Sequence, residues 1–93
     1  MTDVDRIREW VSQWNEEAML VDGFEDAVVG VCERFGAVPV VAYDREQCIE
    51  ILMERDGMDY EEAMEFFGFN VEEAYVGDGT PVFLTLLDKE TGG

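Results

Sequence analysis

The fold class is decided by two apolar runs, AVVGVCERF at residues 27–35 and VPVVAY at residues 38–43, which meet at Gly36 and Ala37. Both runs are rich in β-branched residues, which is typical of strands, and the glycine favours a turn between them. The sequence therefore predicts a β-hairpin. Because Pro39 has no N–H to donate to a neighbouring strand, we expect the second strand to lie at an edge of the sheet.

Apolar spacing before the hairpin predicts a first helix. Six residues recur at intervals of three or four positions, which places them on one helical face: Val4, Ile7, Val11, Trp14, Ala18 and Val21. Thr2 and Asp5 resemble a capping box, and Gly23 is a suitable stop. We expect this face to pack on the sheet. A dimer seam is the alternative, and the absence of sustained heptads disfavours it.

Capping signals predict two more helices after the hairpin. The first begins at Asp44, with Gln47 three residues later, and ends at Gly57; its inner face is expected to hold Cys48, Ile49, Leu52 and Met53. The second begins at Asp59, with Glu62 three residues later, and ends at Gly68; its apolar residues are Tyr60, Ala63, Met64 and Phe67.

The sequence of residues 70–87 predicts a helical turn, a tight turn and a final strand. Asn70 and Glu73 indicate one more helical turn through Tyr75, residues 77–81 read as a tight turn, and Val82 to Leu87 read as a strand. The predicted fold is α+β in the order α-β-β-α-α-β, with a small antiparallel three-stranded sheet of order 2-1-3 and helices on one face. Residues 1–93 suit one domain, and we expect residues 88–93 to fray.

The charge of the chain is the main indication of function. The formal net charge is -17, and the segment from Asp56 to Asp88 holds nine carboxylates with no Lys or Arg. Self-repulsion destabilises a compact state, so such acidity usually serves solubility, a saline medium or a basic partner. It also disfavours direct binding to nucleic acid or to anionic membranes.

Carboxylates recur at helical spacing in the two central helices. The first set is Glu46, Glu50 and Glu54 at i, i+4 and i+8; the second is Glu61, Glu62 and Glu65. A row of this kind places charges about 6 Å apart, with no basic neighbour to support the helix. It can imitate the phosphates that a basic nucleic-acid-binding surface recognises. The simpler interpretation is a solvated face of good helix formers.

Several classes of site are disfavoured. The chain has no His and no nucleophile, phosphate-binding or dinucleotide motif, so we expect no catalytic residues and no cofactor. Cys32 and Cys48 lack metal-ligand spacing and are expected as small buried hydrophobes. The segment 56–59 lacks EF-hand spacing, so no metal site is predicted, although a carboxylate-based one stays a minor alternative.

The aromatic residues near the end of the second central helix are expected in the core: Tyr60, Phe66, Phe67, Phe69 and Tyr75. The alternative is that Phe66 or Phe69 is exposed as an interaction anchor. The N-terminus lacks the basic and apolar regions of a signal peptide, and the longest apolar run is too short for a bilayer span. We therefore expect a cytoplasmic protein, monomeric or homodimeric.

Residues 39–71, read together with AYVG at 74–77 and with Thr80 and Pro81, resemble a family of short, uncharacterised proteins encoded by tailed bacteriophages. The resemblance extends roughly from Gly23 to Phe83 and leaves the first helix outside it. It implies a phage or prophage setting, and hence the host cytoplasm, but no particular chemistry.

The sequence thus predicts a small acidic, non-enzymatic interaction protein. The sharper hypothesis is a nucleic-acid mimic that inhibits a basic DNA- or RNA-binding host protein, including one used in defence against phage. Its binding residues would be the two carboxylate sets, Glu46, Glu50, Glu54, Glu61, Glu62 and Glu65. The alternatives are an accessory or salt-adapted domain whose acidity serves solubility alone, and a carboxylate-based metal-binding protein.

Overall fold

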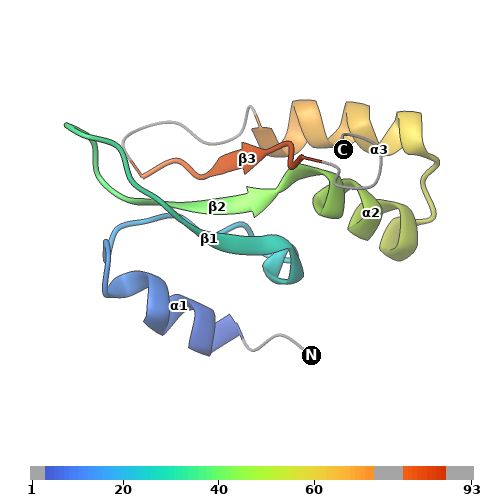
Figure 1. Ribbon diagram of the computed structural model, residues 1–93. Coiled ribbons are helices and arrows are strands. Elements are labelled where there is room, and N and C mark those ends of the chain that lie inside the picture. Colours follow the sequence, from blue (N-terminus) through green and yellow to red (C-terminus); the bar gives the residue numbers. More distant parts are fainter. Residues whose placement is uncertain (1–3, 73–78, 88–93) are drawn as a thin grey trace.

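The computed structural model describes residues 4–72 and 79–87 (Figure 1). The elements are α1 (Val4–Ser12), η1 (Glu25–Ala27), β1 (Val28–Cys32), β2 (Val40–Asp44), α2 (Arg45–Asp56), α3 (Tyr60–Phe67), η2 (Gly68–Glu72) and β3 (Val82–Leu84). The predicted α+β class and the order α-β-β-α-α-β are confirmed.

The predicted hairpin is present, but the sheet around it is arranged differently from the prediction. Strands β1 and β2 pair antiparallel, with Cys32 opposite Val40 and Val28 opposite Tyr43. Strand β3 pairs parallel with β2, so the order is β1-β2-β3 in a mixed sheet. The predicted order 2-1-3, the all-antiparallel pairing and the edge position of the second strand are therefore wrong.

Two physical reasons explain this arrangement. Pro39 lies just before β2, so its missing N–H removes no hydrogen bond from the ladder, and β2 can be central. The chain between β2 and β3 contains α2, α3 and η2, and a crossover of that length is what a parallel neighbour requires.

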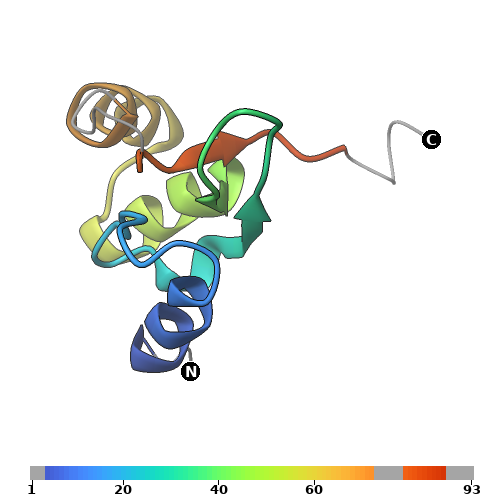
Figure 2. The same cartoon turned by 90° about the vertical axis from the view of Figure 1, so that its left-hand side faces the viewer.

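The core lies on the face of the sheet that α2 and α3 cover (Figure 2). Val41 and Tyr43 of β2 are fully buried against this layer, together with Ile49, Leu52 and Phe67 of the two helices. Tyr43 also accepts a hydrogen bond at its hydroxyl from the Val21 backbone N–H at 2.7 Å. Among the described elements, no helix covers the opposite face of the sheet.

The first helix is shorter than predicted. It ends at Ser12, and the backbone N–H groups of Trp14 and Asn15 close the last turn on the Val11 carbonyl. Asn15 Nδ2 donates to the Pro39 carbonyl at 2.9 Å, which draws the chain away from the helix axis. The predicted stripe therefore breaks, and Val21 reaches the core from a loop.

Trp14 is 46% exposed, so the prediction that it faces the sheet is wrong. Its ring meets that of Trp10 edge to face, with 6.4 Å between the centroids, and Trp10 is exposed as well. Val11 is the one residue of α1 that is buried.

The end of the chain departs from prediction in two places. Gly68 does not end the helical path, which continues as the π-helical turn η2, and the final strand ends at Leu84 rather than at Leu87. Several predictions fall outside the described residues: the cap at Thr2, the turn through Glu73 and Tyr75, residues 77 and 78 of the turn at 77–81, and the tail 88–93.

Candidate interaction surface

Helix α2 is fixed at both ends by the residues that the sequence indicated. The Asp44 side chain accepts hydrogen bonds from the backbone N–H groups of Glu46 and Gln47 at 3.1 and 3.3 Å. Gly57 adopts a left-handed conformation (φ 70°), and its N–H donates to the Met53 carbonyl at 3.1 Å. These are the cap geometries that Asp and Gly favour.

The rotation of α2 about its axis decides which side chains reach solvent. Cys48, Ile49 and Leu52 are completely buried against the core. The opposite face carries Glu46, Glu50 and Glu54, and all three are exposed. None of these carboxylates forms an ion pair with a Lys or Arg in the part of the chain that the structure describes. The row is thus a continuous, unneutralised edge of the helix.

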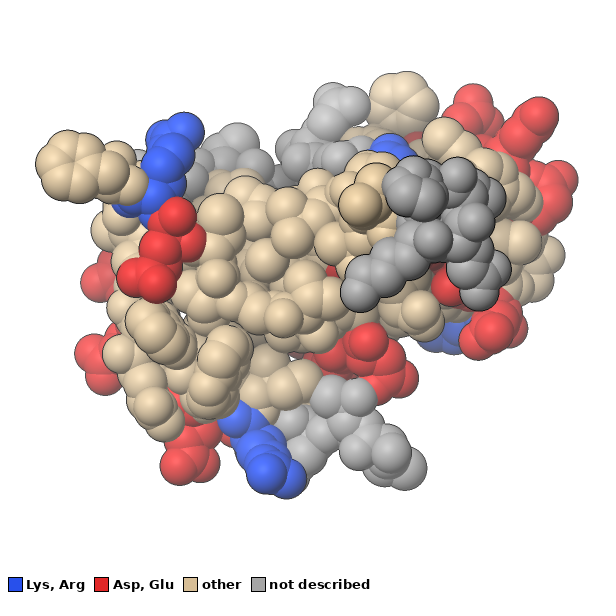
Figure 3. Space-filling view, in the orientation of Figure 1, with Lys and Arg blue, Asp and Glu red and all other residues tan. Residues whose placement is uncertain are grey.

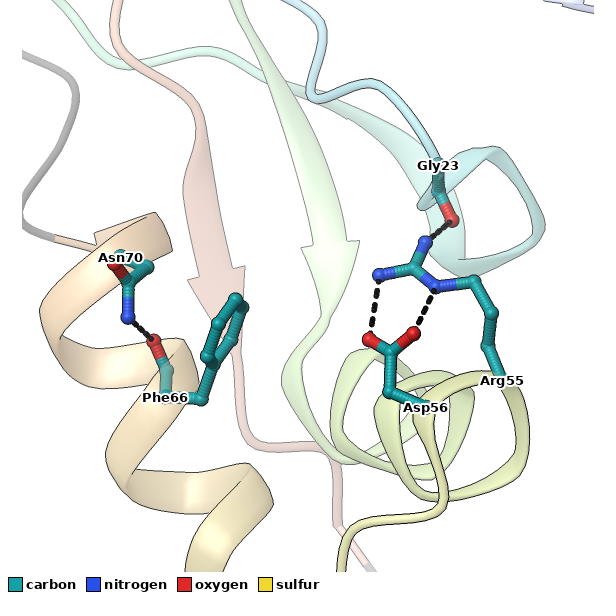
Figure 4. Close-up of polar contacts among 5 residues, drawn as sticks. All are labelled: Gly23, Arg55, Asp56, Phe66 and Asn70. Atoms are coloured by element: carbon teal, nitrogen blue, oxygen red, sulfur yellow. Dashed lines mark hydrogen bonds and ion pairs between the residues drawn. The ribbon is translucent and has the colours of Figure 1, made fainter.

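The two arginines of α2 pack on aromatic rings and leave that row unneutralised. The guanidinium carbon of Arg45 lies 5.5 Å from the centre of the Phe67 ring, and that of Arg55 lies 5.3 Å from the centre of Phe24. Arg55 also donates to the Gly23 carbonyl at 3.5 Å and pairs with Asp56 at 3.2 Å (Figure 4). Arg55 therefore ties the end of α2 to the loop before η1.

Helix α3 begins with the predicted capping box. The Asp59 side chain accepts from the Glu62 N–H at 2.8 Å, and the Glu62 carboxylate accepts from the Asp59 N–H at 3.3 Å. Ala63 and Phe67 face the core, which leaves Glu61, Glu62 and Glu65 exposed. Glu62 therefore has a structural role in addition to its charge, whereas no such role is evident for the other two.

A hydrogen bond joins the start of α3 to the carboxylate row on α2. The Tyr60 hydroxyl donates to Glu46 Oε2 at 3.4 Å, which connects the start of α3 to the row on α2. This bond raises the pKa of the Tyr60 hydroxyl above its ordinary value of 10.0, because ionisation would place two negative charges together. Figure 3 shows acidic side chains at the end of the molecule where α2 and α3 lie and also at the opposite end, near the hairpin turn and α1, while the surface between the two ends is largely uncharged.

A hollow beside α3 adds apolar surface to this acidic region. It has a volume of about 330 Å³ and is lined by Met58, Glu62, Glu65, Phe66, Phe69 and Asn70. Phe69 is 71% exposed and Phe66 38% exposed, so the prediction that these two belong to the core is wrong. Tyr60 is likewise exposed, Phe67 is buried as predicted, and Tyr75 lies outside the described residues.

The π-helical turn η2 positions Phe69. Asn70 Nδ2 donates to the Phe66 carbonyl at 3.1 Å, one turn back along the helix (Figure 4). Departures from α-helical geometry of this kind are frequent at functional sites. Spacing could have indicated the exposure, since Phe66 and Phe69 fall beside Glu62 and Glu65 rather than in line with Ala63 and Phe67.

The described residues give little support to a metal site, a disulfide or a membrane-spanning helix. Within ranges 4–72 and 79–87, no group of three or more Cys, Asp or Glu side chains is placed to hold a metal ion. Both cysteines are reduced thiols; Cys48 is buried and Cys32 is half-buried. Of the helices in those ranges, none has the length and apolar character to cross a bilayer. Comparisons with protein-family models, curated proteins and solved structures find no match.

Proposed function

We propose that the protein is a non-enzymatic inhibitor that occupies the nucleic-acid-binding surface of a basic protein, with its carboxylates in place of phosphates. The observation that carries the proposal is the row formed by Glu46, Glu50 and Glu54, which is exposed and has no cationic partner among the described residues. Like charges at i and i+4 destabilise a helix by about 0.2–0.5 kcal/mol per pair, so the row does not serve the helix itself.

The second carboxylate set extends the same surface. Glu61 and Glu65 are exposed on α3, and the Tyr60–Glu46 hydrogen bond brings the two helices together at the row. Exposed negative charge on two neighbouring helices complements the Lys and Arg side chains that meet the DNA backbone, which carries about one charge per 1.7 Å of axis. In this proposal the setting is a phage or prophage and the target is a host protein.

The test begins with affinity capture from a host lysate at low and moderate salt, after which the captured protein is purified. The parent protein should compete with duplex DNA for this partner. The variant Glu46→Gln/Glu50→Gln/Glu54→Gln should associate about tenfold or more slowly, because electrostatic steering acts mainly on the association rate. Its fold should stay intact or become slightly more stable, since like-charge pairs are removed.

The matched control removes the same charge elsewhere. Glu9, Glu16 and Glu17 are exposed in and after α1, and changing all three to Gln gives the same net charge as the first variant. Only the α2 variant should lose competition with DNA. Equal losses for both variants would mean that net charge alone acts, and no loss for either at low and physiological salt would remove the mimicry proposal.

A further inference from the structure

The helical segment formed by α3 and η2 has two apolar stripes, and only one of them is used by the core. Ala63, Phe67 and Val71 recur every four residues and are buried. A second stripe contains Phe66 and Phe69, which face solvent. Large exposed apolar side chains that cluster in one place indicate an interaction site, since a fold gains nothing from leaving them wet.

The charges around the hollow indicate what would fill it. Apolar surface is supplied by Met58, Phe66 and Phe69, and negative charge by Glu62 and Glu65. No Lys or Arg is among the described residues that line it, and the sequence from residue 56 to residue 88 contains neither. The complementary occupant is therefore both apolar and cationic.

We propose that this hollow receives a basic amphipathic segment of the partner protein. An apolar side chain of that segment fills the space beside Met58 and Phe66, while an arginine lies over the Phe69 ring and pairs with Glu65. Arginine suits the position because its planar guanidinium stacks on an aromatic face and bonds a carboxylate in a bidentate manner. Buried aromatic and arginine anchors of this kind often dominate the affinity of an interface.

This inference rests on the proposed function, because it assigns the anchoring contact of the same basic partner. It adds a hydrophobic anchor beside an electrostatic row. The occupant is a different protein rather than a second copy, since two chains that each carry a formal net charge of -17 repel one another. The row would steer the encounter, and the hollow would govern how long the complex lasts.

A defined probe tests the hollow without knowledge of the partner. The probe is a short synthetic helical peptide with leucines along one face and arginines beside them. The comparison peptides replace the arginines with glutamines or the leucines with serines. Titration into the isotope-labelled full chain, followed by NMR, should move the amide signals of residues 58–70 most. Both comparison peptides should bind at least about tenfold more weakly, because one lacks the cationic side chains and the other lacks the apolar side chains that the hollow would bind.

Protein variants then assign the contact. Phe69→Ala should weaken binding of the arginine–leucine peptide at least about tenfold, as expected for an aromatic anchor. Glu65→Gln should weaken it about two- to fivefold and reduce its dependence on salt. The matched control is Phe35→Ala, because Phe35 is fully exposed in the hairpin loop away from the hollow, and this variant should change binding less than about twofold. The amide spectrum of each variant should be recorded as well, to check that the variant is folded.

The outcomes separate this inference from the proposed function. Loss of binding with Phe69→Ala and not with Phe35→Ala supports the hollow, even if the variant with Gln at 46, 50 and 54 still competes with DNA normally. Amide shifts confined to α2, or equal effects of the two Phe variants, would overturn the hollow and leave the row untouched. Sedimentation that shows a dimer lost in Phe69→Ala would mean that a second copy is the occupant, and would also overturn the proposal.

Discussion

The region of α1 and the region of α2 and α3 are attached to the molecule in different ways. Helices α2 and α3 begin at side-chain caps and place completely buried residues in the core. Helix α1 buries Val11 alone, while Trp10 and Trp14 remain exposed. The comparison indicates that a helix stabilises the fold through the side chains that it buries. Large apolar side chains that stay exposed contribute less.

The largest expected effect is the loss of stability when a buried side chain of the α2 and α3 region is truncated. Phe67 is completely buried, and its ring meets those of Phe24 and Phe83 at 6.2 and 4.9 Å between centroids. Phe67→Ala should cost about 3–5 kcal/mol of unfolding free energy, measured by urea denaturation, because it leaves a cavity and removes the ring under Arg45.

Trp14→Ala is the control from the other region. Since nearly half of Trp14 is already in contact with water, this larger truncation should cost clearly less, about 1–2 kcal/mol. If the two variants are equally destabilised, α1 is held to the core more firmly than its contacts indicate, and the contrast between the regions is lost.

A smaller effect is expected at the caps. Asp44 and Asp59 each satisfy backbone N–H groups at the first turn of a helix. Asp44→Ala and Asp59→Ala should each cost about 0.5–2 kcal/mol in urea denaturation, the usual range for loss of an N-cap. Asp22→Ala removes the same charge from an exposed position that caps no described helix, so it should cost less than about 0.5 kcal/mol. Equal losses at all three positions would show that charge, rather than capping, sets the effect.

These caps also explain which features were predictable from sequence. The signals at Asp44, Gly57, Asp59 and Glu62 are local, because each acts on backbone atoms within four residues, and the structure confirms all of them. The end of α1 depends on Asn15, whose side chain bonds Pro39, 24 positions away in sequence. No periodicity within residues 4–21 contains that information.

The strand order of the sheet and the burial of Phe66 and Phe69 were predicted wrongly. Pairing of β3 with β2 follows from the path of the whole crossover, and the edge rule for Pro39 applies only to residues inside a ladder. For α3, the spacing places Phe67 in line with Ala63 and leaves Phe66 outside that stripe, but the prediction assigned both rings to the core because they are aromatic. The structure packs Phe67 against Phe24 and Phe83. The exposure of the row Glu46, Glu50 and Glu54 could be predicted from helical spacing alone, without contacts between distant parts of the chain.

The smallest expected effect concerns the contact that joins α2 to α3. The hydrogen bond to Glu46 raises the pKa of Tyr60, so its contribution to stability is complete below the unfolded value of about 10 and is lost as pH rises through the folded-state value. NMR titration of labelled tyrosine should show Tyr60 ionising later in the parent than in Glu46→Gln, where the acceptor charge is absent. Glu50→Gln lies one turn further along the same row and should leave the Tyr60 titration unchanged. If both variants lower the pKa of Tyr60 equally, the whole row acts on it through its field, and the specific hydrogen bond between α3 and α2 is not what sets its titration.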